Sequence, residues 1–141
     1  MRARLSMNGP DPDLASERAR EAVRWLQIAI EDRRVAETCI RLSPPAVNSA
    51  AYHCQQAAEK LIKGMLVVAG IHFPKTHDLL TLSKLAETCY PADVGMLAET
   101  VSLTEWAYAY RYPGMEDGPP PHEAEIAGAL DLIERLSARL A

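Results

Sequence analysis

Proline-rich breaks divide this sequence into segments whose apolar residues recur at helical spacing. The clearest breaks are "SPP" at 43–45 and "PGMEDGPPP" at 113–121. No segment alternates apolar and polar residues as a half-buried strand does. Alanine and leucine are frequent while β-branched residues are sparse, which favours helix over strand. The pattern predicts an all-α fold, an antiparallel bundle of four to five helices.

Caps and breaks set the expected limits of the helices. Asp13 or Ser16 can cap the first helix, and Gly70 is suited to end the second. Residues 1–12 are expected to form a flexible N-terminal leader, followed by one helical-bundle domain over 13–141. The expected helices span about 13–42, 46–70, 79–89, 91–111 and 122–141.

Composition excludes several classes of protein. A net charge of −4 argues against a general nucleic-acid binder, whose surface would be basic. No apolar run is long enough to span a membrane, and no secretory signal is apparent. Cys39, Cys54 and Cys89 are odd in number and far apart, so we expect buried, reduced thiols in a cytoplasmic protein. The histidines show no metal-ligand spacing, and we expect neither a metal nor a cofactor.

Two stretches carry a family resemblance. "AAYHCQQAAEKLIKGMLVVAGIHFPKTHDLLTLSKL" at 50–85 contains an H-x-Q-Q-A-x-E-K-x-x-K helix followed by a G-I-x-F-P-K-T-H-D-L connector. "TEWAYAYRYPG" at 104–114 places R-Y-P-G after an aromatic-rich helix. In this order and spacing, the two stretches resemble the HEPN (higher eukaryotes and prokaryotes nucleotide-binding) domain family. The resemblance covers roughly residues 20–140.

The resemblance implies a compact helical bundle that usually forms a homodimer. Some members are metal-independent endoribonuclease toxins with an R-x4–6-H motif. Short stand-alone members are typically encoded beside MNT-type nucleotidyltransferases, which silence them by adding AMP to a tyrosine. This chain resembles the second type, so we expect a nucleotide- or RNA-binding component of a toxin–antitoxin-like pair. Tyr112 is the expected modification site, ahead of Tyr110 and Tyr108.

The competing hypothesis is an endoribonuclease that uses Arg111 and His122. Histidine suits proton transfer, and an arginine can hold a phosphate and its developing charge. Ten residues separate the two, which is longer than the family motif allows. They can equally be the polar ends of two helices, and Arg111 can contact phosphate without His122. We expect binding rather than catalysis.

A polar stripe on the second helix is a candidate nucleotide- or phosphate-binding surface. On a helical wheel, His53, Gln56, Glu59, Lys60 and Lys63 share one sector. The histidine and the two lysines could bind a phosphate or a base. Alternatively, the stripe is a solvated face with a Glu59–Lys63 ion pair, and His53 and Gln56 pack against a neighbouring helix.

His77 is a further candidate for ligand contact because it lies at the start of the third helix. The structural alternative is that Thr76 or Asp78 caps this helix while His77 hydrogen-bonds back to the second helix. The sequence does not choose between them.

The fourth helix shows two apolar faces on a wheel of 3.6 residues per turn. Leu97, Val101 and Thr104 share one face with Tyr108 and Arg111, while Leu103, Trp106 and Tyr110 share another. The second face suggests a dimer contact, unless Trp106 is covered by the first helix. If Trp106 and Tyr110 are exposed without a basic cleft, the chain would be a helical protein-interaction module without a ligand.

Overall fold

The computed structural model describes residues 12–107, 113–114 and 119–141. Most of the expected leader, Arg111 and the three candidate tyrosines, Tyr108, Tyr110 and Tyr112, lie outside the described residues. Within the described ranges every regular element is helical, which confirms the all-α prediction. No helix in these ranges is both long and apolar enough to cross a membrane.

Five α-helices and two short 3₁₀ helices make up the described chain. They are α1 (Pro12–Arg41), α2 (Val47–Ala69), α3 (Leu79–Glu87), η1 (Pro91–Asp93), α4 (Val94–Thr100), η2 (Val101–Ala107) and α5 (Glu123–Ser137). The expected breaks after α1 and α2 are present. Gly70 ends α2 with a left-handed backbone, φ 72°, and the Ile71 amide donates to the Leu66 carbonyl at 2.9 Å.

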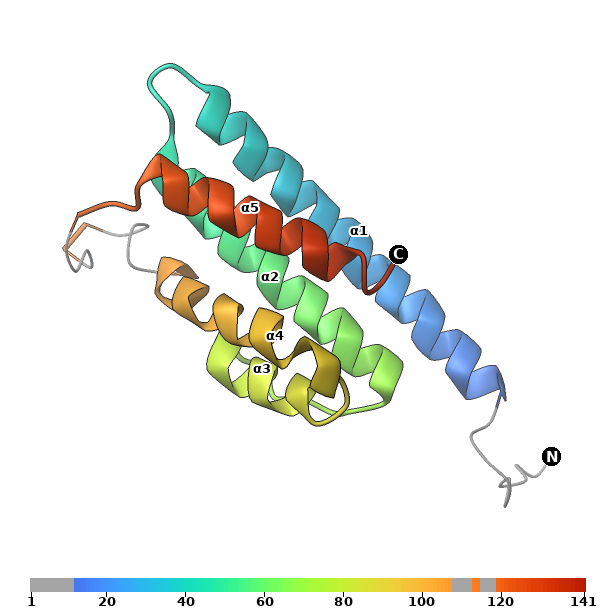
Figure 1. Ribbon diagram of the computed structural model, residues 1–141. Helices are drawn as coiled ribbons and strands as arrows, with labels where there is room; N and C mark the ends of the chain where they lie inside the picture. The colour runs from blue at the N-terminus through green and yellow to red at the C-terminus, as the bar shows by residue number, and fades with distance from the viewer. Residues whose placement is uncertain (1–11, 108–112, 115–118) are drawn as a thin grey trace.

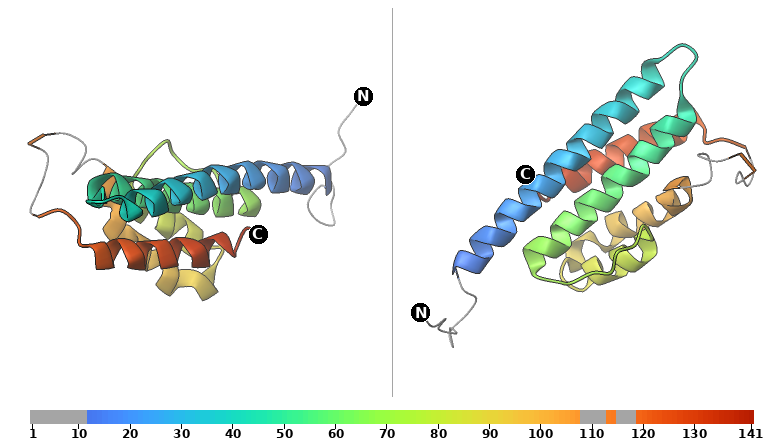
Figure 2. Two further views of the ribbon diagram at one scale, coloured as in Figure 1. Left: turned by 90° about the horizontal axis from the view of Figure 1, so that it is seen from above. Right: turned by 180° about the vertical axis from the view of Figure 1, so that it is seen from behind.

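Helix α2 is the central element of the bundle. Figure 1 shows α1 and α2 as a long antiparallel hairpin, with α5 packed against both of them. Helix α3 and η2 pack on α2 away from α1, and α4 packs on α3 and α5 (Figure 2). Because α2 has neighbours on several sides, 13 of its residues are buried.

Small residues line the contact between α1 and α2. Ala22, Ala29 and Ala36 recur every seven residues on α1, and all three are buried. The facing α2 surface includes buried Ala50, Ala57 and Gly64 at the same spacing. A Cβ added to Gly64 would lie 3.2 Å from Trp25 Cβ and 2.6 Å from Leu140 Cδ1. The helices therefore approach too closely at this point for a side chain to fit without adjustment.

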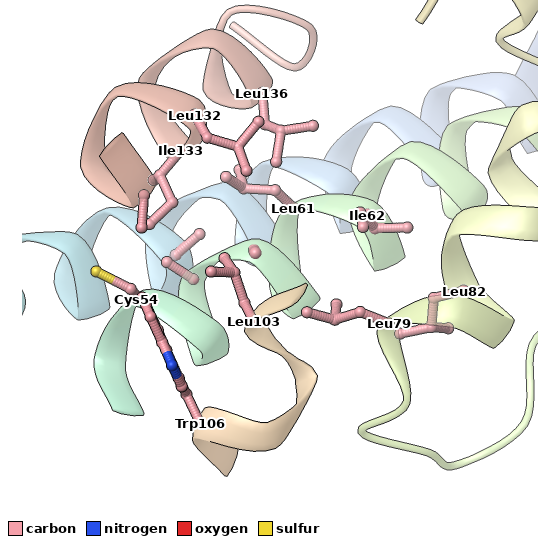
Figure 3. Close-up of a cluster of buried hydrophobic side chains, with 14 of the residues drawn as sticks. Cys54, Leu61, Ile62, Leu79, Leu82, Leu103, Trp106, Leu132, Ile133 and Leu136 are labelled. Atoms are coloured by element: carbon pink, nitrogen blue, oxygen red, sulfur yellow. The ribbon is translucent and has the colours of Figure 1, made fainter. Parts of the chain in front are cut away.

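Larger apolar side chains fill the space on the other sides of α2. Figure 3 shows side chains from α2, α3, η2 and α5 meeting in one cluster. Its largest members are fully buried and come from elements far apart in the sequence: Leu61, Ile62, Met65, Leu66, Leu79, Leu82, Leu97, Ile126, Ile133 and Leu136. This cluster holds the second half of the chain against the α1–α2 hairpin.

The fourth expected helix differs from the prediction in form and in its buried face. Its described part is α4 followed by η2, a 3₁₀ helix, in which residues three apart share a face. Four residues of this segment, spaced three apart, are therefore all buried: Leu97, Thr100, Leu103 and Trp106. A helical wheel with 3.6 residues per turn places them on two different faces. Trp106 is 5% exposed and packs in the monomer core, so it forms no exposed aromatic face. Its element η2 packs against α2, α3 and α4 rather than against the first helix.

The three cysteines differ in burial. Cys54 is buried, Cys39 is partly buried and Cys89 is exposed, so the expectation of three buried thiols is wrong for Cys89. All three are free thiols. Burial, followed by the nearby Cys39 and Glu37, raises the pKa of the Cys54 thiol to about 12. Cys54 therefore remains protonated and inert at neutral pH.

Alanine substitution of two helical glycines tests the close contact between α1 and α2. Gly64→Ala gains helix propensity but must displace Trp25 or Leu140, so we expect the free energy of unfolding to fall by about 1 kcal/mol. Gly128 on α5 is the control because a Cβ there meets nothing within 4 Å. We expect Gly128→Ala to raise stability by about 0.5 kcal/mol in urea unfolding. An equal increase in the free energy of unfolding in both variants would show that the α1–α2 contact can accommodate a methyl group at Gly64.

Candidate functional site

A buried carboxylate organises the polar face of α2. The Glu59 side chain is 1% exposed, and its Oε1 lies 2.7 Å from Lys63 Nζ and 3.0 Å from His77 Nδ1. A carboxylate can only accept, so the proton of the His77 ring lies on Nδ1. The Glu59–Lys63 ion pair expected from the sequence is confirmed, but it is buried rather than solvated. We call Glu59, Lys63 and His77 the Glu59 cluster.

Two aromatic rings cover the Lys63 ammonium. Nζ lies 5.8 Å from the centroid of the Trp25 ring and 5.9 Å from that of Phe73. The two rings contact each other edge to face at 6.3 Å. Trp25 comes from α1 and Phe73 from the connector between α2 and α3, so both elements shield the pair from water. The cation is attracted to both ring faces as well as to Glu59.

The connector over 71–78 is fixed to α2 through a second buried side chain. Gln55 is fully buried, and its Nε2 donates to the His77 carbonyl at 3.3 Å. His77 is thus held at two points, by its ring to Glu59 and by its backbone to Gln55. An irregular segment must find such partners for its polar groups when it packs on a helix.

Gln56 links Lys60 to this network. The Lys60 ammonium donates to Gln56 Oε1 at 2.8 Å, and Gln56 Nε2 donates to Gln55 Oε1 at 2.7 Å. The same Nε2 lies 3.4 Å from Glu59 Oε2. A continuous chain of hydrogen bonds therefore runs from the partly exposed Lys60 to the connector backbone.

The electrostatics of Glu59 follow from these contacts. Burial acts to raise the pKa of its carboxyl group. Hydrogen bonds from Lys63 and His77, together with the positive charges of Lys60 and Lys63, outweigh burial and hold the pKa below its ordinary value. Glu59 is therefore ionised at neutral pH, and the cluster pairs a buried negative charge with a buried ammonium.

His53 does not join the Glu59 cluster. Its Nδ1 lies 2.9 Å from Asp32 Oδ1 on α1, and its ring contacts Tyr52 edge to face at 5.2 Å. His53 thus connects the two helices of the long hairpin, as the packing alternative predicts. Of the candidate binding residues, Lys63 of α2 and His77 of the connector meet at Glu59, and Lys60 reaches them through Gln56.

The start of α3 is capped as expected. Asp78 Oδ1 accepts from the Leu80 amide at 3.0 Å, and Thr81 donates to Asp78 Oδ2 at 2.9 Å. The Thr76 hydroxyl oxygen accepts from the Asp78 amide at 3.0 Å. His77 hydrogen-bonds back to α2, so the structural alternative is confirmed for its Nδ1. Its side chain remains 60% exposed.

His122 is the N-cap of α5. Its Nδ1 accepts from the Ala124 amide at 3.3 Å, and Glu125 Oε1 accepts from the His122 amide at 3.0 Å. The two bonds together form a capping box. Because Nδ1 is an acceptor, the neutral ring carries its proton on Nε2. Its proposed partner Arg111 lies outside the described residues.

Sequence analysis missed several members of the network. Gln55, Asp32, Trp25 and Phe73 were not assigned as parts of a site, although each fixes a candidate residue. One signal was available for Gln55. It lies four residues before Glu59, so the two side chains lie on the same face of the helix and could belong to one polar site. The contacts of Trp25 and Phe73 depend on how three segments pack and have no local signal.

Removing the charge of Glu59 tests the cluster. Glu59→Gln keeps the size of the side chain but leaves the Lys63 ammonium buried without a counter-ion. We expect the free energy of unfolding at pH 7 to fall by about 3 kcal/mol. The folded-state pKa of Glu59 is lowered, so its contribution is complete above the unfolded-state value and is lost as pH falls through the folded-state value. The difference between the two proteins should therefore shrink as the pH is lowered below about 4.5.

Glu87→Gln is the matched control in the same urea titrations. Glu87 pairs with Lys84 at 3.6 Å on α3, where the lysine side chain is 68% exposed. We expect a change below about 0.5 kcal/mol. If Glu59→Gln costs no more than Glu87→Gln, the buried pair is not a stabilising contact.

Comparison with known proteins assigns the family. The model of the HEPN domain matches residues 22–139, which contain the Glu59 cluster, His53 and His122. No curated protein and no solved structure matches the chain. The family match spans most of the sequence and supports a function related to nucleotides or RNA. The chain therefore belongs to the HEPN domain family.

Proposed function

We propose that this protein is the nucleotide- or RNA-binding component of a two-component, toxin–antitoxin-like pair with an MNT-type nucleotidyltransferase. The observation that carries this proposal is the HEPN match over residues 22–139. The resemblance is to the short stand-alone type, for which such a pairing is typical. In this proposal the protein acts in the cytoplasm as a homodimer and binds phosphate groups through Arg111.

The candidates on α2 and the connector divide into structural and accessible groups. Lys63 lies in a buried ion pair with Glu59, and His53 is hydrogen-bonded to Asp32. Lys60 is partly exposed and the His77 side chain is 60% exposed, so a phosphate group can approach the Lys60 ammonium and the ring of His77. A binding role on this face therefore falls to Lys60 and His77, while Lys63 holds the cluster together.

A metal-independent endoribonuclease is the second candidate function. It is favoured by the place of His122 at the exposed N-terminus of α5, where Nδ1 is used in the cap and Nε2 carries a proton. To act as the acid, His122 would have to be the imidazolium ion, which donates its Nε2 proton to the leaving 5′-oxygen when the 2′-hydroxyl attacks the phosphate. Protonation of Nδ1 in that ion would release the cap. Arg111 would stabilise the charge on the phosphate. As a base, His122 would have to give up its cap.

The interaction-module hypothesis loses part of its basis. It required Trp106 and Tyr110 on one exposed face, but Trp106 is buried in the monomer.

Reconstitution with the nucleotidyltransferase tests the proposed pairing. The chain is co-expressed with the MNT-type enzyme of its gene neighbourhood, and the purified mixture is incubated with ATP and Mg²⁺. We expect a stable complex and the covalent mass of one AMP group on Tyr112, absent from Tyr112→Phe and retained in Tyr110→Phe and Tyr108→Phe. A folded chain that neither binds the enzyme nor gains AMP would rule out the pairing.

Cleavage of a mixed RNA substrate without metal tests the second candidate. His122→Asn is the informative variant because asparagine is a good N-cap but transfers no proton. If His122 acts in catalysis, His122→Asn and Arg111→Ala should each lower the rate by at least about 100-fold while the unfolding midpoint of His122→Asn is unchanged. Cleavage that survives in His122→Asn would exclude an acid role for this residue.

A further inference from the structure

A groove lies at the end of the bundle where α1 passes the C-terminus of α2. Its volume is about 760 Å³, and it is open to solvent. One wall is the first part of α1, and the other is the last turn of α2 with the beginning of the connector (Figures 1 and 2). The lining includes Arg18, Arg20, Arg24 and His72. We call this space the arginine groove.

The three arginines of the groove have no carboxylate partner among the described residues. Other arginines of the chain do: Arg33, Arg41, Arg135 and Arg139 each lie within 4.0 Å of an acidic side chain. The chain has 19 acidic residues and only 15 lysines and arginines, so carboxylates are in excess. The groove is lined by three guanidinium groups and two carboxylates, those of Glu17 and Glu21, so its lining carries a small excess of positive charge on an acidic protein.

Arg18 is fixed in the groove by the absence of a side chain at Gly70. A Cβ at Gly70 would lie 2.6 Å from Arg18 Cζ, so the guanidinium rests directly on the glycine. This position is at the C-terminus of α2, where a positive charge is favourable. Arg18 thus has a structural role, whereas Arg20 and Arg24 are exposed and make no such contact.

The rest of the lining supplies the other features that a nucleotide needs. Glu17 and Glu21 add two carboxylates, which can accept hydrogen bonds from ribose hydroxyl groups. Ile71 and Phe73 add an apolar and aromatic surface for a base. A simple anion site would not need carboxylates beside the arginines. The volume is within the range of small-molecule sites, about 300–1,000 Å³.

We propose that the arginine groove binds a nucleoside triphosphate, with Arg20 and Arg24 on the phosphates, Glu17 and Glu21 at the ribose and Phe73 at the base. This inference rests on the proposed nucleotide-binding function and adds a site away from His122. The groove lies at the opposite end of α2 from the start of α5 (Figure 1). A ligand there would leave His122 free for a second interaction.

Calorimetric titration of the full-length chain with ATP tests the proposal. The variant is Arg20→Gln/Arg24→Gln, which removes two exposed arginines that make no ion pair with the described residues. The matched control is Arg34→Gln, an exposed arginine of α1 outside the groove that also lacks an ion pair among the described residues. We expect the double variant to weaken ATP binding by roughly 100-fold, about tenfold for each charge-assisted contact, and the control to bind as the wild type does.

Two further ligands separate a nucleotide site from a plain anion site. Inorganic triphosphate carries the phosphate charge without ribose or base. Adenosine carries the ribose and the base without phosphate. We expect triphosphate to bind at least about tenfold more weakly than ATP, because it leaves the carboxylates and Phe73 unused. Equal affinity for triphosphate and ATP would overturn the nucleotide assignment.

The outcomes also separate this inference from the proposed function. ATP binding that persists in the double variant overturns the arginine groove but leaves the pairing with a nucleotidyltransferase untouched. Absence of AMP on Tyr112, with ATP binding that depends on Arg20 and Arg24, overturns the pairing and leaves the groove. A wild-type chain that binds no ATP at low salt overturns the groove, whichever result the pairing experiment gives.

Discussion

The close approach of α1 and α2 depends on residues that have almost no side chain at the contact. Alanines on α1 face alanines and Gly64 on α2, so the two backbones come near enough for Trp25 to reach across to Lys63. With α1 this close, α2 exposes little of its surface to solvent and can serve as the core for α3, η2 and α5. Dispersion and burial over this long contact stabilise the hairpin on which the other helices pack.

The polar side of α2 performs a different task. Gln55 and Glu59 bind the connector that follows α2, and they do so through one residue, His77. The residues that carry the family resemblance in this stretch are therefore largely residues that hold the connector in place. Lys60 and His77 are the members that still face solvent in part, and the proposed binding role is confined to them. The residues that hold the connector and the groups proposed to bind a ligand therefore lie on one polar surface, formed by α2 and the connector.

The sequence predicted the all-α fold, a cap of α3 by Thr76 or Asp78 and the Gly70 end of α2, because these depend on local spacing. It left the burial of Trp106 open, because the change to three residues per turn in η2 has no signal in a pattern of 3.6 residues per turn. The burial of Glu59 was also missed, since the rings that cover Lys63 come from segments far apart in the chain. Arg20 and Arg24 read as ordinary surface charges until the end of α2 is placed beside them.

Temperature changes the balance between the buried charged contacts of the Glu59 cluster and the apolar contacts between the helices. The hydration of a charged group becomes less favourable on heating, so the cost of removing Glu59 and Lys63 from water falls. Apolar contacts do not gain in the same way, because hydrophobic stabilisation per unit area levels off. On heating, the Glu59 cluster therefore becomes a larger share of what holds the connector to α2, because Glu59 binds His77 and Lys63 lies against Phe73.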